Sequence, residues 1–326
     1  TVVSPVMIEC AEKLVETINC ADWAFFAKNG GDVTTLAVMT ARHATGRKKI
    51  IMMEHGYHGV YQWCQKAGTP GVLDEEICNN LYVPFNDFEA IKKMVDDHPG
   101  EIAGILSMPY DHISHYDNVL PDEDYWPKVR KLCDEKGIVL IIDDVRAGFR
   151  MDLAGSDHYF GIKADLLTLG KAIANGWNMA ALVGRKEMRE AVEDMNYTGS
   201  YWLSAVPLAA SVAAITKMKE INAVGIMQKT GEKLTRGLKQ TADANGVKLS
   251  TTGLPSLFKI ILKDPDESLI PHQVWVGEMV RRGVYISHFH NMFTNTVMTD
   301  EDLQYTFDVA DEAFKIVTKK YPEILI

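Results

Sequence analysis

The sequence of 326 residues carries a formal net charge of −10, with 34 Lys and Arg against 44 Asp and Glu. An acidic chain has no electrostatic attraction for nucleic acid or for an anionic membrane, so we expect neither as a partner. Hydrophobic residues make up 47% and charged residues 24% of the chain, a composition typical of a globular protein with one large or two moderate domains.

Five cysteines are scattered along the chain without a CxxC pair, at Cys10, Cys20, Cys64, Cys78 and Cys133. This odd, dispersed set indicates reduced thiols and predicts a cytoplasmic protein with no metal site. No apolar run reaches membrane-spanning length, and Glu9 interrupts the first apolar residues where a signal peptide would continue. The first residue is Thr rather than Met, so residue 1 need not be the natural start of the chain.

The first 170 residues alternate predicted helices with short apolar strands. In chain order we expect helices over 5–18 and 32–45, a strand over 48–53, a helix over 87–97, a strand over 102–106, a helix over 122–136, and strands over 138–142 and 165–169. Apolar positions at helical spacing indicate the helices, and continuous apolar runs indicate buried strands. The alternation predicts an α/β fold in which a mainly parallel sheet is covered on both faces.

The pattern changes from about residue 203. We expect long helices over 203–219 and 225–245, a strand over 257–262, a helix over 272–282, a strand over 284–287 and a last helix over 300–318. This order is typical of a smaller α+β domain. We therefore place a large domain at residues 1–215 and a small domain at residues 216–326.

Two predicted strands end in ionisable residues, Asp143 and Lys171. Ligands of open α/β sheets bind beyond the carboxyl ends of the strands. A buried Asp143 carboxylate needs a cation, and the protonated ring of pyridoxal 5′-phosphate (PLP) would be one, with Lys171 as the amine for a Schiff base. Taken alone, a loop anchor and a solvated lysine are the more ordinary interpretations of these two residues.

Two glycine-containing segments lie upstream of this pair. Residues 29–32 (NGGD) open a predicted helix, where backbone amides would suit a phosphate, although taken alone a plain helix start capped by Asn29 or Asp32 is the favoured interpretation. Residues 56–59 (GYHG) place an aromatic ring between glycines, where it would stack on a flat cofactor, although taken alone an ordinary loop aromatic is the favoured interpretation.

Taken together and in order, these segments resemble the class III PLP-dependent aminotransferases, and most closely the glutamate-1-semialdehyde aminomutase branch. The resemblance runs from about residue 5 to 318. Its strongest parts are residues 141–150 (IIDDVRAGFR) and 165–176 (DLLTLGKAIANG), supported by residues 41–50 (ARHATGRKKI) and 57–59 (YHG).

The resemblance implies the type I fold of aspartate aminotransferase and a homodimer with active sites at the subunit interface. It implies that Lys171 forms the Schiff base with PLP and that Asp143 pairs with the pyridine nitrogen. Val145 would press on one face of the ring, and Tyr57 would stack near the other.

The resemblance also assigns the phosphate of PLP to the amides of Gly30 and Gly31. The family's Ser-Gly-Thr loop is Asn-Gly-Gly here, and its phosphate-binding Thr from the neighbouring subunit aligns with Trp202. Ser200 or Thr198 would take the place of that Thr. The Glu that follows the family's Asp is Asp144 in this chain.

Other departures lie on the substrate side. The family's Glu-Pro is Met108-Pro109, and His288 and His290 fall where the aminomutase branch has substrate-side residues of its own. The family also has an N-terminal segment at the substrate pocket that this sequence does not include. The departures surround the substrate and the phosphate, so the sequence leaves the amine donor and acceptor open.

We therefore expect a PLP enzyme that moves an amino group of an amine or amino-acid substrate, either between two molecules or within one. A racemase or epimerase of the same fold is one alternative, because returning the proton to the opposite face would produce it. A non-catalytic PLP-binding homologue is the other.

Overall fold

The computed structural model describes residues 3–112 and 116–326. The chain divides into two compact units: the first takes in the residues up to 111 together with 121–221, and the second takes in 112–120 together with 222–326. The boundary expected at residues 215 and 216 lies inside helix α8 (Ala205–Glu220), which belongs to the first unit. The transfer of residues 112–120 to the second unit has no counterpart in the sequence pattern.

A seven-stranded sheet in the order β1-β7-β6-β5-β4-β2-β3 forms the centre of the first unit. Its strands are β1 (Trp23–Ala27), β2 (Lys49–Met53), β3 (Asn80–Val83), β4 (Ile102–Ser107), β5 (Val139–Asp143), β6 (Leu166–Leu169) and β7 (Ala180–Gly184). Only β7 runs antiparallel to its neighbours β1 and β6. The predicted α/β fold with a mainly parallel sheet is confirmed, and β1, β3 and β7 are strands that the pattern did not indicate.

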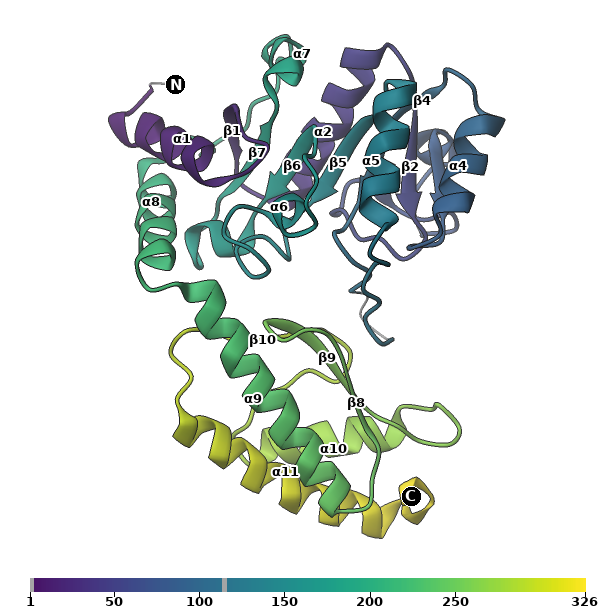
Figure 1. Ribbon diagram of the computed structural model, residues 1–326, viewed down its shortest axis with the longest axis vertical. Coiled ribbons are helices and arrows are strands. Elements are labelled where there is room, and N and C mark those ends of the chain that lie inside the picture. The colour runs from purple at the N-terminus through teal and green to yellow at the C-terminus, as the bar shows by residue number, and fades with distance from the viewer. Residues whose placement is uncertain (1–2, 113–115) are drawn as a thin grey trace. The chain divides into compact units, whose positions relative to one another are not determined.

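Both faces of this sheet are covered by helices (Figure 1). The helices of the unit are α1 (Pro5–Thr17), α2 (Gly30–Thr45), α3 (Asp74–Ile77), α4 (Phe88–Asp97), α5 (Tyr125–Lys136), α6 (Ser156–Tyr159), α7 (Arg189–Glu193) and α8 (Ala205–Glu220). Side chains of α1, α4, α5 and α8 share one core with Leu140 and Ile142, while those of α2 share a second core with Val139 and Ile141. Because successive strand residues are buried on opposite faces, the strands are continuously apolar in sequence.

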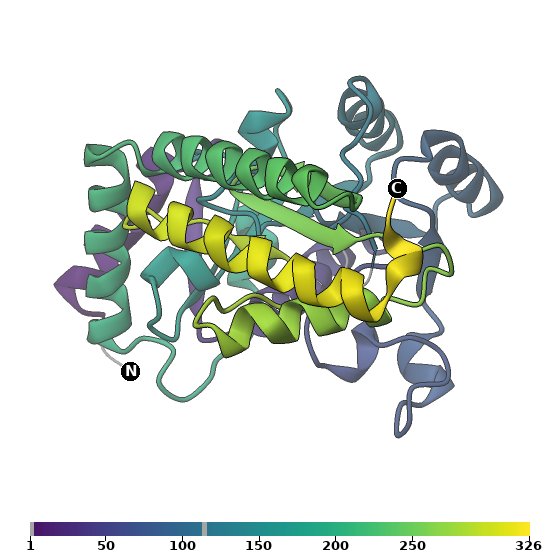
Figure 2. The ribbon, with the colours of Figure 1, turned by 90° about the horizontal axis from the view of Figure 1, so that it is seen from below.

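The second unit contains a three-stranded antiparallel sheet in the order β10-β9-β8. Its elements are α9 (Ala223–Ala244), β8 (Leu249–Leu254), β9 (Leu257–Leu262), α10 (Ile270–Arg281), β10 (Met292–Phe293) and α11 (Asp300–Lys320). The three helices lie side by side in Figure 2, and their apolar faces enclose a core in which the rings of Trp275 and Phe314 stack at 5.0 Å.

The strand predicted over 284–287 is wrong. After Gly283, whose φ of +86° ends the helical path, residues 284–287 form an irregular loop, and the ring of Tyr285 is 87% exposed. The edge of β9 pairs instead with Met292–Phe293. Apolar residues in a short segment therefore marked a cavity-lining loop rather than a strand.

The segment around Asp117 is fixed to the sheet of the second unit by polar contacts. The Asp117 carboxylate pairs with Lys263 at 2.7 Å and accepts a hydrogen bond from Ser250 at 2.8 Å. The backbone N–H of Asn118 donates to the Thr252 hydroxyl at 2.8 Å. These bonds explain why residues 112–120 belong with a part of the chain more than a hundred positions away.

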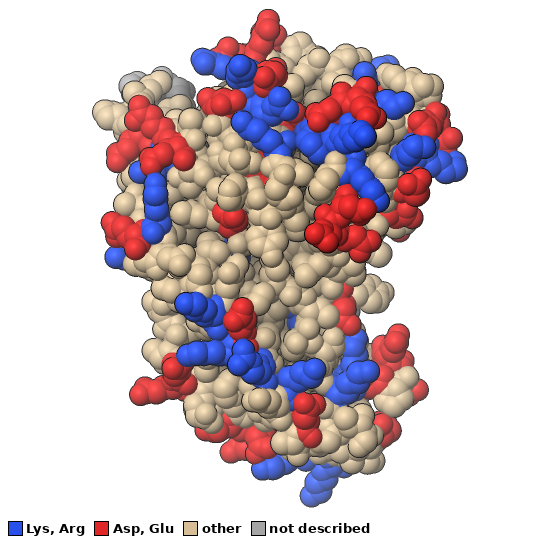
Figure 3. All heavy atoms as spheres, viewed as in Figure 1, with Lys and Arg blue, Asp and Glu red and all other residues tan. Residues whose placement is uncertain are grey.

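Within residues 3–112 and 116–326, no helix combines the length and apolar character that crossing a bilayer requires. Acidic and basic side chains are interspersed on the face of each unit that Figure 3 shows. This face therefore offers no broad basic surface to a polyanion.

Candidate active site

Asp143 and Lys171 lie at the carboxyl ends of two adjacent strands. Asp143 is the last residue of β5 and is paired in register with Thr168 of β6. Lys171 follows β6 after one glycine and opens a short 3₁₀ helix, Lys171–Ala174. The pairing of β5 with β6 thus brings together two residues that are 28 positions apart in sequence, as the topology of parallel sheets predicts.

The Asp143 carboxylate is buried and accepts hydrogen bonds from three directions. His58 Nδ1 lies 2.6 Å from Oδ2, while the Thr168 hydroxyl and the Val145 N–H donate to Oδ1 at 3.1 and 3.2 Å. Burial alone would raise the pKa of Asp143, but these bonds and the charges of His58 and Lys171 outweigh it, so the pKa lies below its ordinary value. Asp143 is therefore held as an anion.

His58 is the contact of Asp143 that the sequence did not reveal. Its ring is buried, and its backbone carbonyl accepts a hydrogen bond from the Thr34 hydroxyl of α2 at 2.6 Å. With Nδ1 directed at Asp143, the other ring nitrogen, Nε2, has no hydrogen-bond partner among the described residues. The available signal was only its position beside Tyr57 in the glycine-bounded loop.

Lys171 has a backbone and a charge state unusual for lysine. Its φ of +44° is in the left-handed region, which non-glycine residues seldom adopt outside special sites. Its side chain is exposed overall, yet partial burial of the ammonium group and the nearby Arg146 charge lower its pKa to about 8, against the opposing effect of Asp143. At neutral pH a lysine with this pKa is neutral, and thus nucleophilic, far more often than an ordinary lysine.

Val145 lies between two glycines, and larger residues at either position would meet it. A Cβ atom on Gly30 would lie 2.7 Å from Val145 Cγ1, and one on Gly170 would lie 3.0 Å from the same atom. Val145 is thereby in contact with Gly30, at the start of α2, and with Gly170, the residue before Lys171. The absence of side chains at these two positions lets Val145 pack directly on both backbone segments.

The loop after residue 56 packs on the first turn of α2. Gly59 has a φ of +122°, and a Cβ atom there would lie 2.8 Å from the Gly31 Cα atom. The Tyr61 hydroxyl donates to Asp32 at 2.6 Å, and this bond with burial raises the pKa of Tyr61 to about 12. The first amides of an α-helix lack intrahelical acceptors, so Gly30 and Gly31 present donors suited to a phosphate.

Tyr57 and Ser200 are not brought into this cluster of buried groups. The Tyr57 side chain is 60% exposed, with its phenol near the Arg146 charge. Ser200 is exposed and makes no hydrogen bond to the described residues, while Trp202 packs on Tyr197 with ring centroids 5.2 Å apart. The role expected for Ser200 is to contact the phosphate site of a neighbouring subunit, and it stays a prediction.

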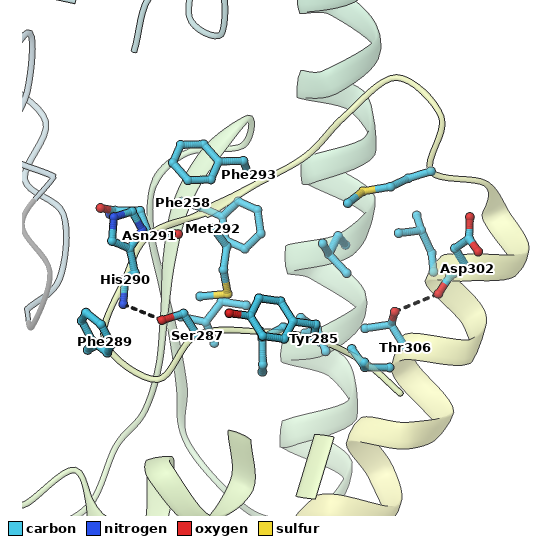
Figure 4. A pocket seen from close by; sticks show the side chains of 17 residues that line it. Phe258, Tyr285, Ser287, Phe289, His290, Asn291, Met292, Phe293, Asp302 and Thr306 are labelled. Atoms are coloured by element: carbon cyan, nitrogen blue, oxygen red, sulfur yellow. Dashed lines mark hydrogen bonds between the residues drawn. The ribbon is translucent and has the colours of Figure 1, made fainter. Parts of the chain in front are cut away.

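The second unit contains a separate apolar cavity of about 590 Å³ between β9, the loop after residue 283 and the helices α9 and α11 (Figure 4). Phe258, Met292 and Phe293 supply much of its wall, and Ser287 accepts a hydrogen bond from the His290 N–H at 3.1 Å. Of the histidines noted in sequence, His290 lines this cavity. None of the predicted site residues of the first unit lines this cavity.

The family model described as aminotransferase class III matches residues 3–319. The chain belongs to the class III aminotransferase family. Its membership confirms the predicted family and enzyme class, amino-group transfer with PLP as the cofactor.

Several class III relatives are similar over most of the chain. The aminopentol aminotransferase of Sphingopyxis macrogoltabida is 34% identical over 98% of this chain and 76% of its own length. The glutamate-1-semialdehyde 2,1-aminomutase of Methanocaldococcus jannaschii is 28% identical over 94% of this chain and 77% of its own. The solved structure of the FumI protein of Sphingopyxis sp. MTA144, in its PLP internal aldimine form, superposes with a TM-score of 0.95 at 33% identity, over 99% of this chain and 78% of that one.

Proposed function

We propose that this class III enzyme transfers an amino group from a primary amine to a separate acceptor molecule, with Lys171 and Asp143 as its catalytic residues. The observation that carries the proposal is the anionic, triply hydrogen-bonded Asp143 at the strand end next to Lys171. A buried carboxylate needs a cation opposite it, and a protonated pyridine ring meets that need.

The fit of these residues to PLP is supported by the anionic Asp143 at the strand end next to Lys171, which suits a protonated ring nitrogen, and by the backbone amides at the start of α2, which suit a phosphate. Bound PLP supplies an aldehyde that condenses with amines and a ring that accepts electrons when a proton leaves the substrate carbon. The amides of Gly30 and Gly31 would hold its phosphate, and the Val145 side chain would contact one face of its ring. Tyr57, exposed within one chain, would cover the other face.

Lys171 Nζ would hold the cofactor between turnovers and move a proton during them. Its pKa of about 8 makes the neutral amine accessible, so that Nζ could take the proton from the carbon of the amine donor and, in the second half of the transfer, deliver a proton to the corresponding carbon of the acceptor. Asp143 would keep the proton on the ring nitrogen, and His58 and Thr168 hold the carboxylate in the orientation this requires.

Support for transfer between two molecules comes from the named relatives. The aminopentol aminotransferase is 34% identical, and the 3-aminobutyryl-CoA aminotransferase of Cloacimonas acidaminovorans is 31% identical over 94% of this chain. The aminomutase of Methanocaldococcus jannaschii is 28% identical. On this support we propose as donor an amine outside the common α-amino acids.

We further propose a cytoplasmic homodimer in which Ser200 of one subunit reaches the phosphate site of the other. Its exposure within one chain is compatible with a contact to a second copy. The five cysteines are all free, which is compatible with a reducing compartment. Sedimentation measurements with and without PLP test the dimer.

The decisive experiment is a visible absorption spectrum of the purified protein with PLP, repeated for Lys171→Ala and for Lys131→Ala. Lys131 is the matched control because its side chain is 78% exposed. We expect the visible band in the wild type and in Lys131→Ala, and its loss in Lys171→Ala. A band that persists unchanged in Lys171→Ala would refute the assignment of Lys171.

Product analysis separates the proposed reaction from its alternatives. One chiral amine is supplied with and without an oxo-acid acceptor. Amino transfer that depends on the acceptor supports the proposal. Loss of chirality without transfer indicates a racemase, migration of the amino group within one molecule indicates an aminomutase, and PLP binding without turnover indicates a non-catalytic homologue.

A further inference from the structure

Asp143 and its neighbour Asp144 direct their carboxylates to different partners. Asp143 faces His58 and Thr168, whereas Asp144, with no exposed surface, faces the start of α6. There the Ser156 N–H donates to Asp144 Oδ2 at 2.9 Å and the Ser156 hydroxyl donates to Oδ1 at 2.7 Å. The alternation of side chains along an extended backbone explains the two directions.

The backbone of Asp144 ties the same point to the rest of the sheet. Its N–H donates to the Thr168 carbonyl at 3.0 Å, and its carbonyl accepts from the Gly148 N–H at 2.7 Å. A Cβ atom on Gly148 would lie 2.7 Å from that carbonyl oxygen, so the turn closes tightly on Asp144. The positions of Asp143 and Val145, on either side of Asp144, therefore depend on how the backbone and side chain of Asp144 are held.

The pair with Ser156 can survive a change of protonation. An ionised Asp144 accepts from both the N–H and the hydroxyl of Ser156. A protonated Asp144 can donate to the same hydroxyl, which reverses its role, while the other oxygen still accepts from the N–H. Burial, with the charges of Asp157 and Asp143, raises the pKa of Asp144 to about 7 against the two bonds from Ser156.

Other ionisable groups face this carboxyl from the surrounding segments. Asp157 of α6 and the thiol of Cys20 interact electrostatically with Asp144, and the positive charge of Arg150, from the segment after β5, attracts the Asp144 carboxylate. Asp157 is itself buried and accepts hydrogen bonds from Asn19 at 3.0 Å and the Ala164 N–H at 3.2 Å. The surroundings of Asp144 are thus fixed by bonds that do not involve the cofactor residues.

We propose that Asp144 is a positioning residue for the cofactor site: its pair with Ser156 fixes the carboxyl end of β5, and with it Asp143 and Val145, in both protonation states of the carboxyl. This inference rests on the proposed function, because it assumes that Asp143 and Val145 contact PLP. Asp144 itself would contact neither the cofactor nor the substrate.

The test measures the PLP affinity of the apoprotein for the wild type, Asp144→Ala, Asp144→Asn, Ser156→Ala and Asp165→Ala. Asparagine keeps an acceptor and a donor for Ser156 and mimics the protonated carboxyl. Asp165 is the matched control: it is buried, accepts from the Leu140 N–H at 2.8 Å and pairs with Arg130 at 2.8 Å, but precedes β6 at its amino end. Circular dichroism and the unfolding temperature of each apoprotein are recorded beside the affinity.

We expect the PLP dissociation constant to rise about tenfold or more in Asp144→Ala and to stay within about threefold of wild type in Asp144→Asn and Asp165→Ala. The PLP dissociation constant of Ser156→Ala, which removes one bond of the pair, should lie between that of Asp144→Ala and that of the wild type. This variant replaces Asp144→Ala in the test if Asp144→Ala does not fold. An unchanged affinity in both Asp144→Ala and Ser156→Ala overturns the proposal, as does an equal loss in Asp165→Ala.

A loss in Asp144→Asn equal to that in Asp144→Ala overturns the claim that the neutral carboxyl keeps the anchor. A wild-type apoprotein that binds no PLP overturns the proposed function, and this inference with it. Failure of the proposed function is distinguishable from failure of this inference alone, because it appears in the wild-type protein before any variant is made.

Discussion

His58 Nδ1 and Asp143 Oδ2 lie 2.6 Å apart in a buried pair that joins the loop after β2 to the end of β5. In a low-dielectric site a hydrogen bond to a carboxylate stabilises its charged form, which is why the pKa of Asp143 stays low despite burial. The pair therefore sets how strongly Asp143 can hold a proton on a neighbouring ring nitrogen.

Replacing His58 by Ala should raise the pKa of Asp143 and weaken its hold on a protonated ring. A change of about one to two pKa units corresponds to ~1.4–3 kcal/mol, or roughly 10- to 100-fold in ring protonation. We expect kcat to fall by a factor of this order, with KM little changed. Steady-state kinetics of the holoenzyme and the pH dependence of its visible spectrum measure both effects.

His43→Ala provides the control, because His43 forms an exposed pair with Asp194 at 3.0 Å. That pair is solvated and should contribute little to stability or activity. If His58→Ala has the kcat and the spectrum of His43→Ala, His58 has no part in the state of Asp143.

Arg146 should keep the Lys171 amine more acidic than an ordinary lysine. After burial, its charge is the largest influence that lowers the pKa of Lys171 to about 8. Arg146→Gln removes that charge, so the pKa should rise and the neutral fraction at pH 7, about a tenth in the wild type, should fall. The rate at which the apoprotein captures PLP should then drop at pH 7 and recover toward pH 9.

Arg189→Gln is the comparison for Arg146→Gln, since Arg189 is exposed and pairs with Glu193 on α7. Its capture rate should follow the wild-type pH profile. A profile of Arg146→Gln that also follows the wild type would show that the Arg146 charge does not set the acidity of Lys171, and that burial with the Arg150 charge accounts for it.

Asp143 and Lys171 were predictable as neighbours because each lies at the carboxyl end of a mainly apolar strand. Five apolar positions before Asp143 indicated a buried strand, and the register of β5 with β6 then fixed the neighbourhood of Asp143 and Thr168. The layers of the fold were predictable for the same reason, since buried strands and amphipathic helices carry local patterns.

His58 was not predictable as the partner of Asp143, because 85 residues separate them and the contact depends on how an irregular loop folds over β5. Strands β1 and β7 were missed because short apolar runs such as theirs do not by themselves distinguish a strand from a buried helix segment, and the pairing of β7 with both β1 and β6 makes them strands. The loop over 284–287 shows the converse case, in which apolar residues face a cavity without any strand partner. Long-range contacts decide all three, and local patterns do not contain them.

Gly30 should not tolerate even a methyl group. A Cβ atom there would lie 2.7 Å from Val145 Cγ1, so Gly30→Ala must displace either the start of α2 or Val145. We expect PLP affinity to fall about tenfold, and the double variant Gly30→Ala with Val145→Ala to recover part of the loss. Fluorescence titration of the apoprotein with PLP gives both values.

Gly277→Ala is the helical control for Gly30→Ala. Gly277 lies within α10, where an added Cβ atom would be 3.8 Å from the flexible Arg281 guanidinium, an ordinary van der Waals distance. This change should stabilise the protein by about 0.5–1 kcal/mol, because Ala favours helix over Gly, without altering PLP affinity. A Gly30→Ala variant that binds PLP like Gly277→Ala would contradict the close packing of Val145 on Gly30.

His272 should make the second unit sensitive to acid. Its Nδ1 accepts from the Leu262 N–H at 3.2 Å and its Nε2 donates to the His288 carbonyl at 3.0 Å, so the buried ring is neutral. Burial lowers its pKa to about 4. The unfolded chain binds a proton below about pH 6.5 and the folded chain does not, so stability falls as the pH drops from about 6.5 to 4.

A shift of this size corresponds to at most about 3 kcal/mol of unfolding free energy lost across that range. His272→Phe should remove this part of the pH dependence. It should also cost about 1–3 kcal/mol at pH 7, because the Leu262 N–H and the His288 carbonyl lose their partner. Denaturant unfolding at several pH values, followed by circular dichroism, measures both quantities. If the difference between wild type and His272→Phe is the same at pH 4.5 and pH 7, the ring of His272 is not the group that responds to acid.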